Sequence, residues 1–144
     1  MILDVILREY GPGGAFYEVL DTGNHVMWVA THVYGDQWLP KTTYGTYTCK
    51  RGLHTIPTGE RLTTFEVINV KGHTGILFVH PGNLPQKDSD GCFICGVAPG
   101  WIGKERAVIA SRQCYEHTFL PKMEGIEEFQ INITNRELGD GVAD

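Results

Sequence analysis

The sequence predicts one domain spanning residues 1–144, with a mainly β fold: a mostly antiparallel β-sandwich or open barrel that carries one short C-terminal helix. Short apolar runs recur along the whole chain, and only one segment has a helical pattern. The 18 glycines and 7 prolines lie between these runs, which is typical of strands joined by many turns. With 42% hydrophobic residues, a chain of 144 residues is long enough to form one sizeable core.

Seven segments are predicted as strands: residues 5–9, 15–20, 25–32, 45–50, 61–70, 75–79 and 128–134. The turn sequence Asp-Thr-Gly-Asn at residues 21–24 predicts a hairpin between the second and the third. Residues 45–50 alternate between the two faces in the way a half-buried strand does. Residues 75–79 are almost wholly apolar, which predicts a strand at the centre of the sheet with His80 at its end.

Residues 111–120 are predicted to form the one helix, with Ser111 as its cap and Pro121 as the signal that ends it. Residues 96–103 contain glycines, Pro99 and Trp101, and they are predicted to form a loop beside Cys92 that acts as a lid or a docking surface. The acidic residues 137–144 are predicted to fray.

The charge of the chain excludes one class of partner. A net charge of −5 offers no basic surface to nucleic acid. The N-terminal apolar run is interrupted by Asp4 and lacks a basic leader, so we expect no signal peptide. No apolar stretch approaches the roughly 20 residues that cross a bilayer, so no membrane partner is expected. Reduced thiols are then the expectation for the four cysteines, of which Cys49 and Cys114 are predicted to be small buried residues.

The segment from His80 to Cys92 is the part of the chain with the residue types for catalysis. A thiol becomes a nucleophile when it loses its proton, and a histidine within hydrogen-bond reach takes that proton and later returns it to a leaving amine. Gly91, directly before Cys92, permits close approach of a substrate and aims backbone N–H groups at a developing oxyanion. Four turn-forming residues are expected to hydrogen-bond the intervening loop into shape: Asn83, Asp88, Ser89 and Asp90.

This pattern is similar to that of the YkuD-type L,D-transpeptidases, in which a strand-end His-Gly is followed by Ser-x-Gly-Cys. Residues 56–59, Ile-Pro-Thr-Gly, also look like their Thr-Pro-x-Gly element. The resemblance implies that Cys92 attacks the tetrapeptide stem of peptidoglycan with His80 as the base, releasing D-alanine by hydrolysis or by transfer to an amine. Ile94 stands where those enzymes carry an arginine, which removes a cation that could bind a substrate carboxylate.

The chain resembles more closely a family of unknown function that is common in bacteriophage and prophage genomes. Its members read His-x-Gly-Asn and then Asp-x-x-Gly-Cys, as residues 80–83 and 88–92 do here. This resemblance implies either a phage enzyme acting on peptidoglycan peptides or a non-catalytic structural protein of the tail or baseplate, whose partners are other phage structural proteins. Without a signal peptide, such a protein is expected in the virion or the host cytoplasm, and it meets the cell wall by phage delivery or lysis.

Several alternatives stay open for individual residues. His80 and Cys92 also fit a structural pair, in which the histidine bonds the loop and the cysteine packs. Cys92 and Cys95 have the spacing of a redox pair, and with two histidines they make a conceivable zinc site, but no second close-spaced ligand pair exists and no metal or cofactor is expected. His73 lines the same cleft as His80 or lies in a surface turn. Four aromatic residues form either a wall on which a sugar or peptide stacks or ordinary core or interface packing: Trp28, Trp38, Trp101 and Tyr44.

Overall fold

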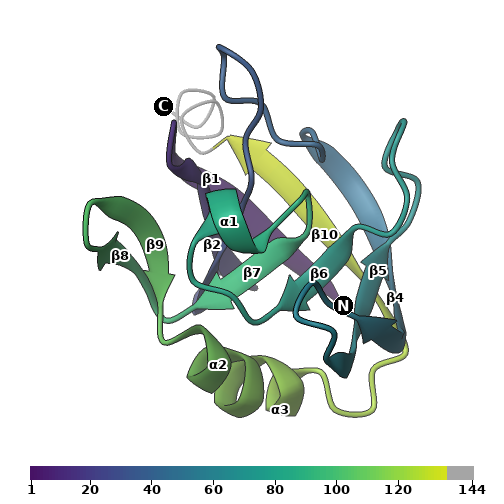
Figure 1. Cartoon of the computed structure of the whole chain (residues 1–144). Helices are drawn as coiled ribbons and strands as arrows, with labels where there is room; N and C mark the ends of the chain where they lie inside the picture. Colours follow the sequence, from purple (N-terminus) through teal and green to yellow (C-terminus); the bar gives the residue numbers. More distant parts are fainter. Residues whose placement is uncertain (136–144) are drawn as a thin grey trace.

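Eight strands close into a barrel in the computed structural model, which describes residues 1–135 (Figure 1). The barrel strands are β1 (Ile2–Gly11), β2 (Gly14–Asp21), β3 (Asn24–Thr31), β4 (Gly45–Thr55), β5 (Arg61–Val67), β6 (Leu77–His80), β7 (Phe93–Gly96) and β10 (Glu128–Asn135). Their order around the barrel is β1-β10-β4-β5-β6-β7-β3-β2. Most neighbours are antiparallel, whereas β1 with β10 and β6 with β7 are parallel. The predicted mainly β fold is confirmed, and the pairing of β1 with β10 closes the sheet on itself.

Inward-facing side chains fill the barrel. An eight-stranded barrel has an interior just wide enough for side chains to occupy. Here rings from the strands and the helix meet edge to face or tilted, and they are those of Phe65, Phe78, Phe93, Phe119 and Phe129. The closest pair, Phe65 and Phe129, has ring centroids 4.8 Å apart. The barrel therefore has a packed core, and any binding site must lie at its ends or on its surface.

One helical segment covers an end of this barrel (Figure 1). It consists of α2 (Ser111–Cys114), a π-helical turn η1 (Tyr115–Phe119) and α3 (Leu120–Lys122), and its Phe119 and the following Met123 are buried in the core. The predicted helix is thus confirmed, but the prediction that Ser111 caps it is wrong. Ala110 holds the cap position, and the Ser111 hydroxyl instead accepts a 2.9 Å hydrogen bond from the Gly82 amide.

The predicted hairpin is confirmed, with Asp21 paired to Asn24 across the turn between β2 and β3. The predicted strand over residues 61–70 ends earlier, at Val67, and the apolar strand begins at Leu77 rather than at residue 75. All four residues of β6 are buried, as a central strand requires. No helix within the described part of the chain has the length and hydropathy needed to cross a membrane.

Residues 96–103 are not the predicted loop. They contain β8 (Ala98–Ile102), which pairs with β9 (Glu105–Ile109) in a two-stranded sheet beside the barrel (Figure 1). Gly100 indicated a turn, but it is needed in this strand because a Cβ there would lie 2.6 Å from the Ile109 side chain. Strand β7 and the single turn α1 (Pro85–Asp88) were also not predicted. The predicted fraying of residues 137–144 falls outside the described residues.

Candidate functional site

The parallel pairing of β6 and β7 sets the geometry of the candidate site. Phe78 is paired with Phe93 and His80 with Ile94, so both strands run the same way and residues 81–92 form the crossover between them. His80 ends β6, whereas Cys92 precedes the start of β7, at the opposite end of the strand pair. Leu77 lies beside Cys92 and is three residues before His80 on the same strand. Three residues of an extended strand span roughly 10 Å. The two motif residues are therefore held apart along the strands.

The His80 imidazole is buried in the fold. Its side chain is buried, with only 1% of the residue exposed, and its Nδ1 lies 2.8 Å from the Pro81 carbonyl oxygen. Because a carbonyl oxygen only accepts, Nδ1 carries the proton, and Nε2 is left as a buried acceptor without a partner. Burial lowers the pKa of His80, although the Pro81 hydrogen bond and the charge of Asp88 act in the opposite direction.

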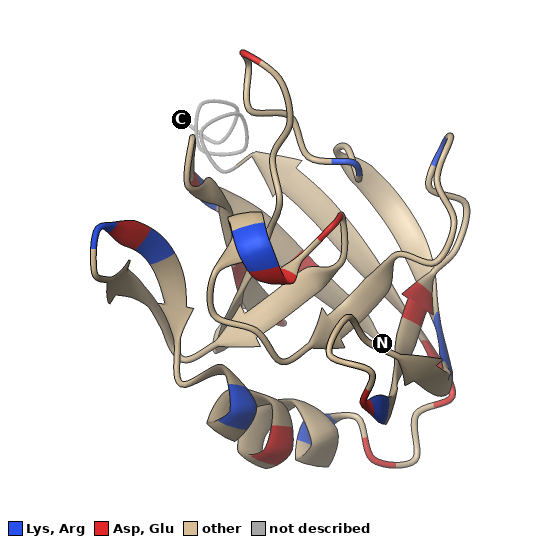
Figure 2. Ribbon diagram, viewed as in Figure 1, with Lys and Arg blue, Asp and Glu red and all other residues tan. Residues whose placement is uncertain are grey.

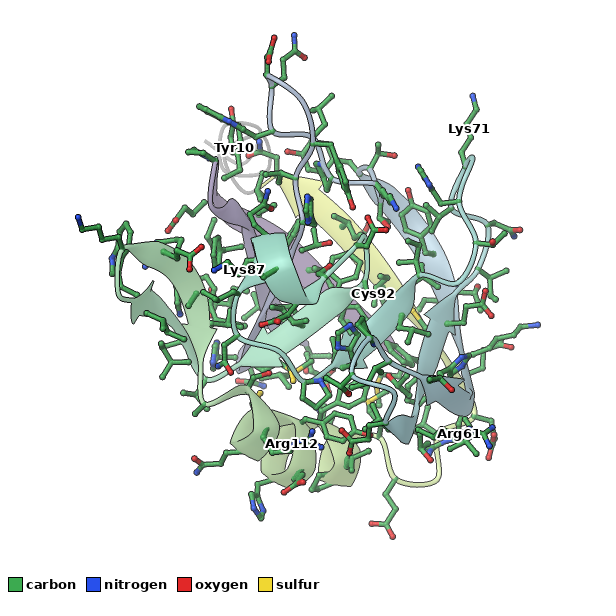
Figure 3. The ribbon with its side chains drawn as sticks, in the orientation of Figure 1. Tyr10, Arg61, Lys71, Lys87, Cys92 and Arg112 are labelled. Atoms are coloured by element: carbon green, nitrogen blue, oxygen red, sulfur yellow. The ribbon has the colours of Figure 1, made fainter. Side chains whose placement is uncertain are left out.

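Cys92 is half-buried and lies at the start of β7 (Figure 3). Its Sγ accepts a 3.3 Å hydrogen bond from the Leu77 amide and lies 3.7 Å from the Gly75 carbonyl oxygen, to which the thiol donates. Burial raises the pKa of this thiol; the Leu77 amide and Lys41 lower it, and Asp90 adds to the increase. No hydrogen bond joins Cys92 to His80 among the described residues, so the thiol has no base in contact with it.

Two polar side chains order the first half of the crossover. Asp88 Oδ2 accepts hydrogen bonds from the Asn83 and Leu84 amides, at 3.0 and 2.9 Å, and thereby satisfies backbone donors at the start of α1. Asn83 is bound to β9 through both its backbone and its side chain: its carbonyl accepts from Val108 N at 2.9 Å, and its Nδ2 donates to Val108 O at 2.7 Å. These bonds attach the loop to the β8–β9 sheet.

The second half of the crossover is attached to β3. The buried Ser89 hydroxyl donates to Cys92 O and accepts from the Gly91 amide at 3.2 Å, so this amide is already occupied and does not face an open oxyanion site. Thr31 Oγ1 lies 2.9 Å from Cys92 O. Gly91 has φ +108°, and a Cβ there would lie 2.6 Å from the side chain of Lys41. Glycine is therefore required here by backbone conformation and by packing.

Two residues near Cys92 were not predicted, and both come from the β3–β4 connection. The Tyr34 hydroxyl donates to Asp90 Oδ1 at 2.5 Å, and Lys41 Nζ lies 3.2 Å from the same oxygen and 3.0 Å from Asp90 O. The side-chain hydrogen bonds from Tyr34 and Lys41 lower the pKa of the Asp90 carboxyl. Tyr34 and Lys41 lie in a loop without a recognisable motif, so nothing in the sequence could have placed them here.

The remaining candidates do not join this site. His73 is exposed in the turn between β5 and β6, where its amide donates to Val70 O. Cys95 is buried inside the barrel, and its hydrogen bond with Cys114, together with burial, raises its pKa. Cys49 and Cys114 are buried as predicted. Within residues 1–135 no group of three or more His, Cys, Asp or Glu side chains is placed to hold a metal ion.

Two surface hollows lie elsewhere, with volumes of about 580 and 600 Å³, and neither is lined by His80 or Cys92. Charged side chains of both signs are interspersed over the face seen in Figure 2, but β6 and β7 themselves carry no charged residue.

Comparison of the chain with protein-family models, with curated proteins and with solved structures finds no match.

Proposed function

We propose that this chain is a non-catalytic structural or accessory domain, such as a component of a phage tail or baseplate, in which the His80–Cys92 segment serves as a stabilised crossover. The phage setting comes from the sequence resemblance. The proposal of a non-catalytic domain rests on one observation: the polar groups of the motif form hydrogen bonds that hold the loop in place. Asp88 and Ser89 bind backbone groups within the loop, and Asn83 binds β9.

The electrostatics of the two central residues support the same proposal. A nucleophilic cysteine is activated by a lowered pKa or by an adjacent base. Here burial raises the pKa of the Cys92 thiol, and its sulfur is bound to the backbone of Leu77 rather than to an imidazole. His80 has its donor nitrogen on Pro81 O and its ring enclosed.

Alkylation of Cys92 by iodoacetamide across pH tests this proposal. We expect slow alkylation, with a midpoint above the ordinary thiol pKa of 9.0, because burial raises the pKa. His80→Asn is the diagnostic variant, since the asparagine amide can still donate to Pro81 O but lacks an atom at the position of Nε2. Alkylation should be the same in this variant, and Cys92→Ser identifies the labelled residue. Rapid alkylation below about pH 8 that His80→Asn abolishes would overturn the proposal.

A second candidate is the cysteine enzyme acting on peptidoglycan stem peptides. It is favoured by the unpartnered Nε2 of His80, which is the free acceptor that a general base needs, and by the partial exposure of Cys92. In this reaction His80 Nε2 takes the proton of the Cys92 thiol, the thiolate attacks the stem carbonyl and forms a thioester, and D-alanine leaves with the proton that His80 returns to its amine. Water or an amine then cleaves the thioester, giving hydrolysis or a cross-link. For this reaction the His80 imidazole must first move into contact with the Cys92 sulfur.

Incubation with disaccharide-tetrapeptide, followed by mass spectrometry, tests this second candidate. Loss of D-alanine with the native chain and none with Cys92→Ser would establish the enzyme. Absence of product, under conditions in which a known transpeptidase reacts, would leave the non-catalytic domain as the function.

A further inference from the structure

A hollow of about 580 Å³ lies at one rim of the barrel, between the β1–β2 end and the β3–β4 loop. Three exposed rings line it: Tyr10 is 57% exposed, Trp38 39% and Tyr44 51%. Tyr10 lies at the end of the molecule away from Arg112, which marks the helical segment (Figure 3). The hollow includes neither Cys92 nor His80, so what it binds is a separate question from the chemistry of the crossover.

The backbone holds Trp38 in an unfavourable conformation to form this wall. Its φ is +53°, in the left-handed region that side chains other than glycine rarely adopt. Two hydrogen bonds between Tyr34 and Leu39, of 2.9 and 3.0 Å, close the turn around it. The indole then meets Tyr10 at an interplanar angle of 62°, with ring centroids 6.3 Å apart, so the two rings form a corner. Strain maintained at a ligand-sized hollow is typical of a binding site.

The charge of the hollow selects the ligand. Among the described residues, Asp36 is the one charged side chain in its lining, and it makes no ion pair or hydrogen bond with another described residue. No lysine or arginine in the described part of the lining neutralises it.

We propose that this hollow binds a small alkylated ammonium ion in solution, of the chemical class of choline or tetramethylammonium. Aromatic faces attract such cations through their ring quadrupoles, and a nearby carboxylate adds to the attraction. Tyr10, Trp38 and Tyr44 supply the faces and Asp36 the charge. The volume of the hollow lies within the range of small-molecule pockets, about 300–1,000 Å³. An anionic ligand would meet a carboxylate without a compensating cation in the described lining.

The second hollow provides a matched comparison. Trp101 lines it and is 64% exposed, but the guanidinium of Arg106 already lies 4.9 Å from its ring centroid. That aromatic face has a cation from the protein itself. Substitution of Trp101 should therefore leave ammonium binding unchanged, whereas substitution of Trp38 should not.

Titration of the full chain with tetramethylammonium and with choline, followed by calorimetry and by tryptophan fluorescence, tests the proposal. The control ligand is 3,3-dimethyl-1-butanol, the uncharged carbon analogue of choline, which should not bind measurably. Trp38→Leu should weaken binding about tenfold and Asp36→Asn about threefold, with Trp101→Leu equal to the native chain.

Three results would overturn the proposal. Equal binding of choline and its carbon analogue would make the hollow an apolar site without selectivity for charge. Binding of an N-acetylglucosamine oligosaccharide, with none of tetramethylammonium, would make it a sugar site. Concentration-dependent self-association that Trp38→Leu abolishes, without ammonium binding, would make it an interface between two copies of the chain.

Discussion

The most direct test of how the crossover is stabilised is the substitution Asp88→Ala. In the native chain one oxygen, Asp88 Oδ2, accepts hydrogen bonds from the Asn83 and Leu84 amides at 3.0 and 2.9 Å. The truncation removes the shared acceptor of both hydrogen bonds while the amides stay half-buried. A hydrogen bond to a charged group contributes about 1.5–3 kcal/mol, and access of water to these amides recovers part of that. We expect a loss of about 2–3 kcal/mol in the free energy of unfolding.

Urea denaturation and thermal melting measure this effect. The midpoint should fall without a change in m-value, and the melting temperature should drop by about 6–9 °C. Asp88→Asn retains an oxygen that can accept both bonds, so it should lose less than about 1 kcal/mol. The matched control is Asp90→Ala, which removes a loop carboxylate whose side chain is 83% exposed and should change stability by no more than about 1 kcal/mol. The reasoning is refuted if Asp88→Ala matches this control, or if Asp88→Asn is as destabilising as alanine.

Three further outcomes are expected from the contacts of the fold. Gly91→Ala should lower the free energy of unfolding by about 2–3 kcal/mol in urea, through its positive φ and its clash, whereas Gly59→Ala, with positive φ in open space, should lose less. Burial would raise the pKa of Glu18, but hydrogen bonds from Arg8 and His25 outweigh it and lower this pKa below 4.5. The stability that the Glu18 carboxylate contributes is therefore present above pH 4.5 and is lost on acidification. Glu18→Gln should reduce the fall in the free energy of unfolding measured between about pH 5 and pH 3. Tyr115→Phe removes a 2.6 Å hydrogen bond to a β5 carbonyl and should lower the urea-derived stability by about 1 kcal/mol, and no change would contradict it.

Much of the barrel could be predicted because its strands have strong local signals. β2 and β3 are apolar-rich runs that flank a turn sequence, and β6 is apolar up to His80, so local pattern is enough to predict them. β8 could not be predicted in this way, since Pro99 and Gly100 are both residues that usually end strands. In a two-stranded sheet proline is tolerated at an edge that needs no N–H donor, and glycine admits a close neighbour. Tertiary contact overrides local preference at both positions.

The relation between His80 and Cys92 could not be predicted for a different reason. In a hairpin, the end of the first strand and the start of the second lie side by side. In a parallel crossover, the same two points lie at opposite ends of the strand pair, separated by the length of the strands. The sequence between the two residues does not distinguish these cases. Only the pairing of Phe78 with Phe93 and of His80 with Ile94 establishes that the strands are parallel.

The short parallel crossover also explains the motif without reference to catalysis. About a dozen residues is the lower limit for such a connection, and most crossovers satisfy their backbone groups with a full helix. This one has a single helical turn, so side chains must supply the missing partners, as Asp88 and Ser89 do. Glycines are required where the loop packs closely against itself and against its neighbours: a Cβ at Gly82 would lie 2.9 Å from Asp88 Cβ, and one at Gly91 would lie 2.6 Å from Lys41. The same glycines and acids that resemble an active-site signature are thus the ones this topology needs, and the reactivity of the Cys92 thiol distinguishes the two explanations.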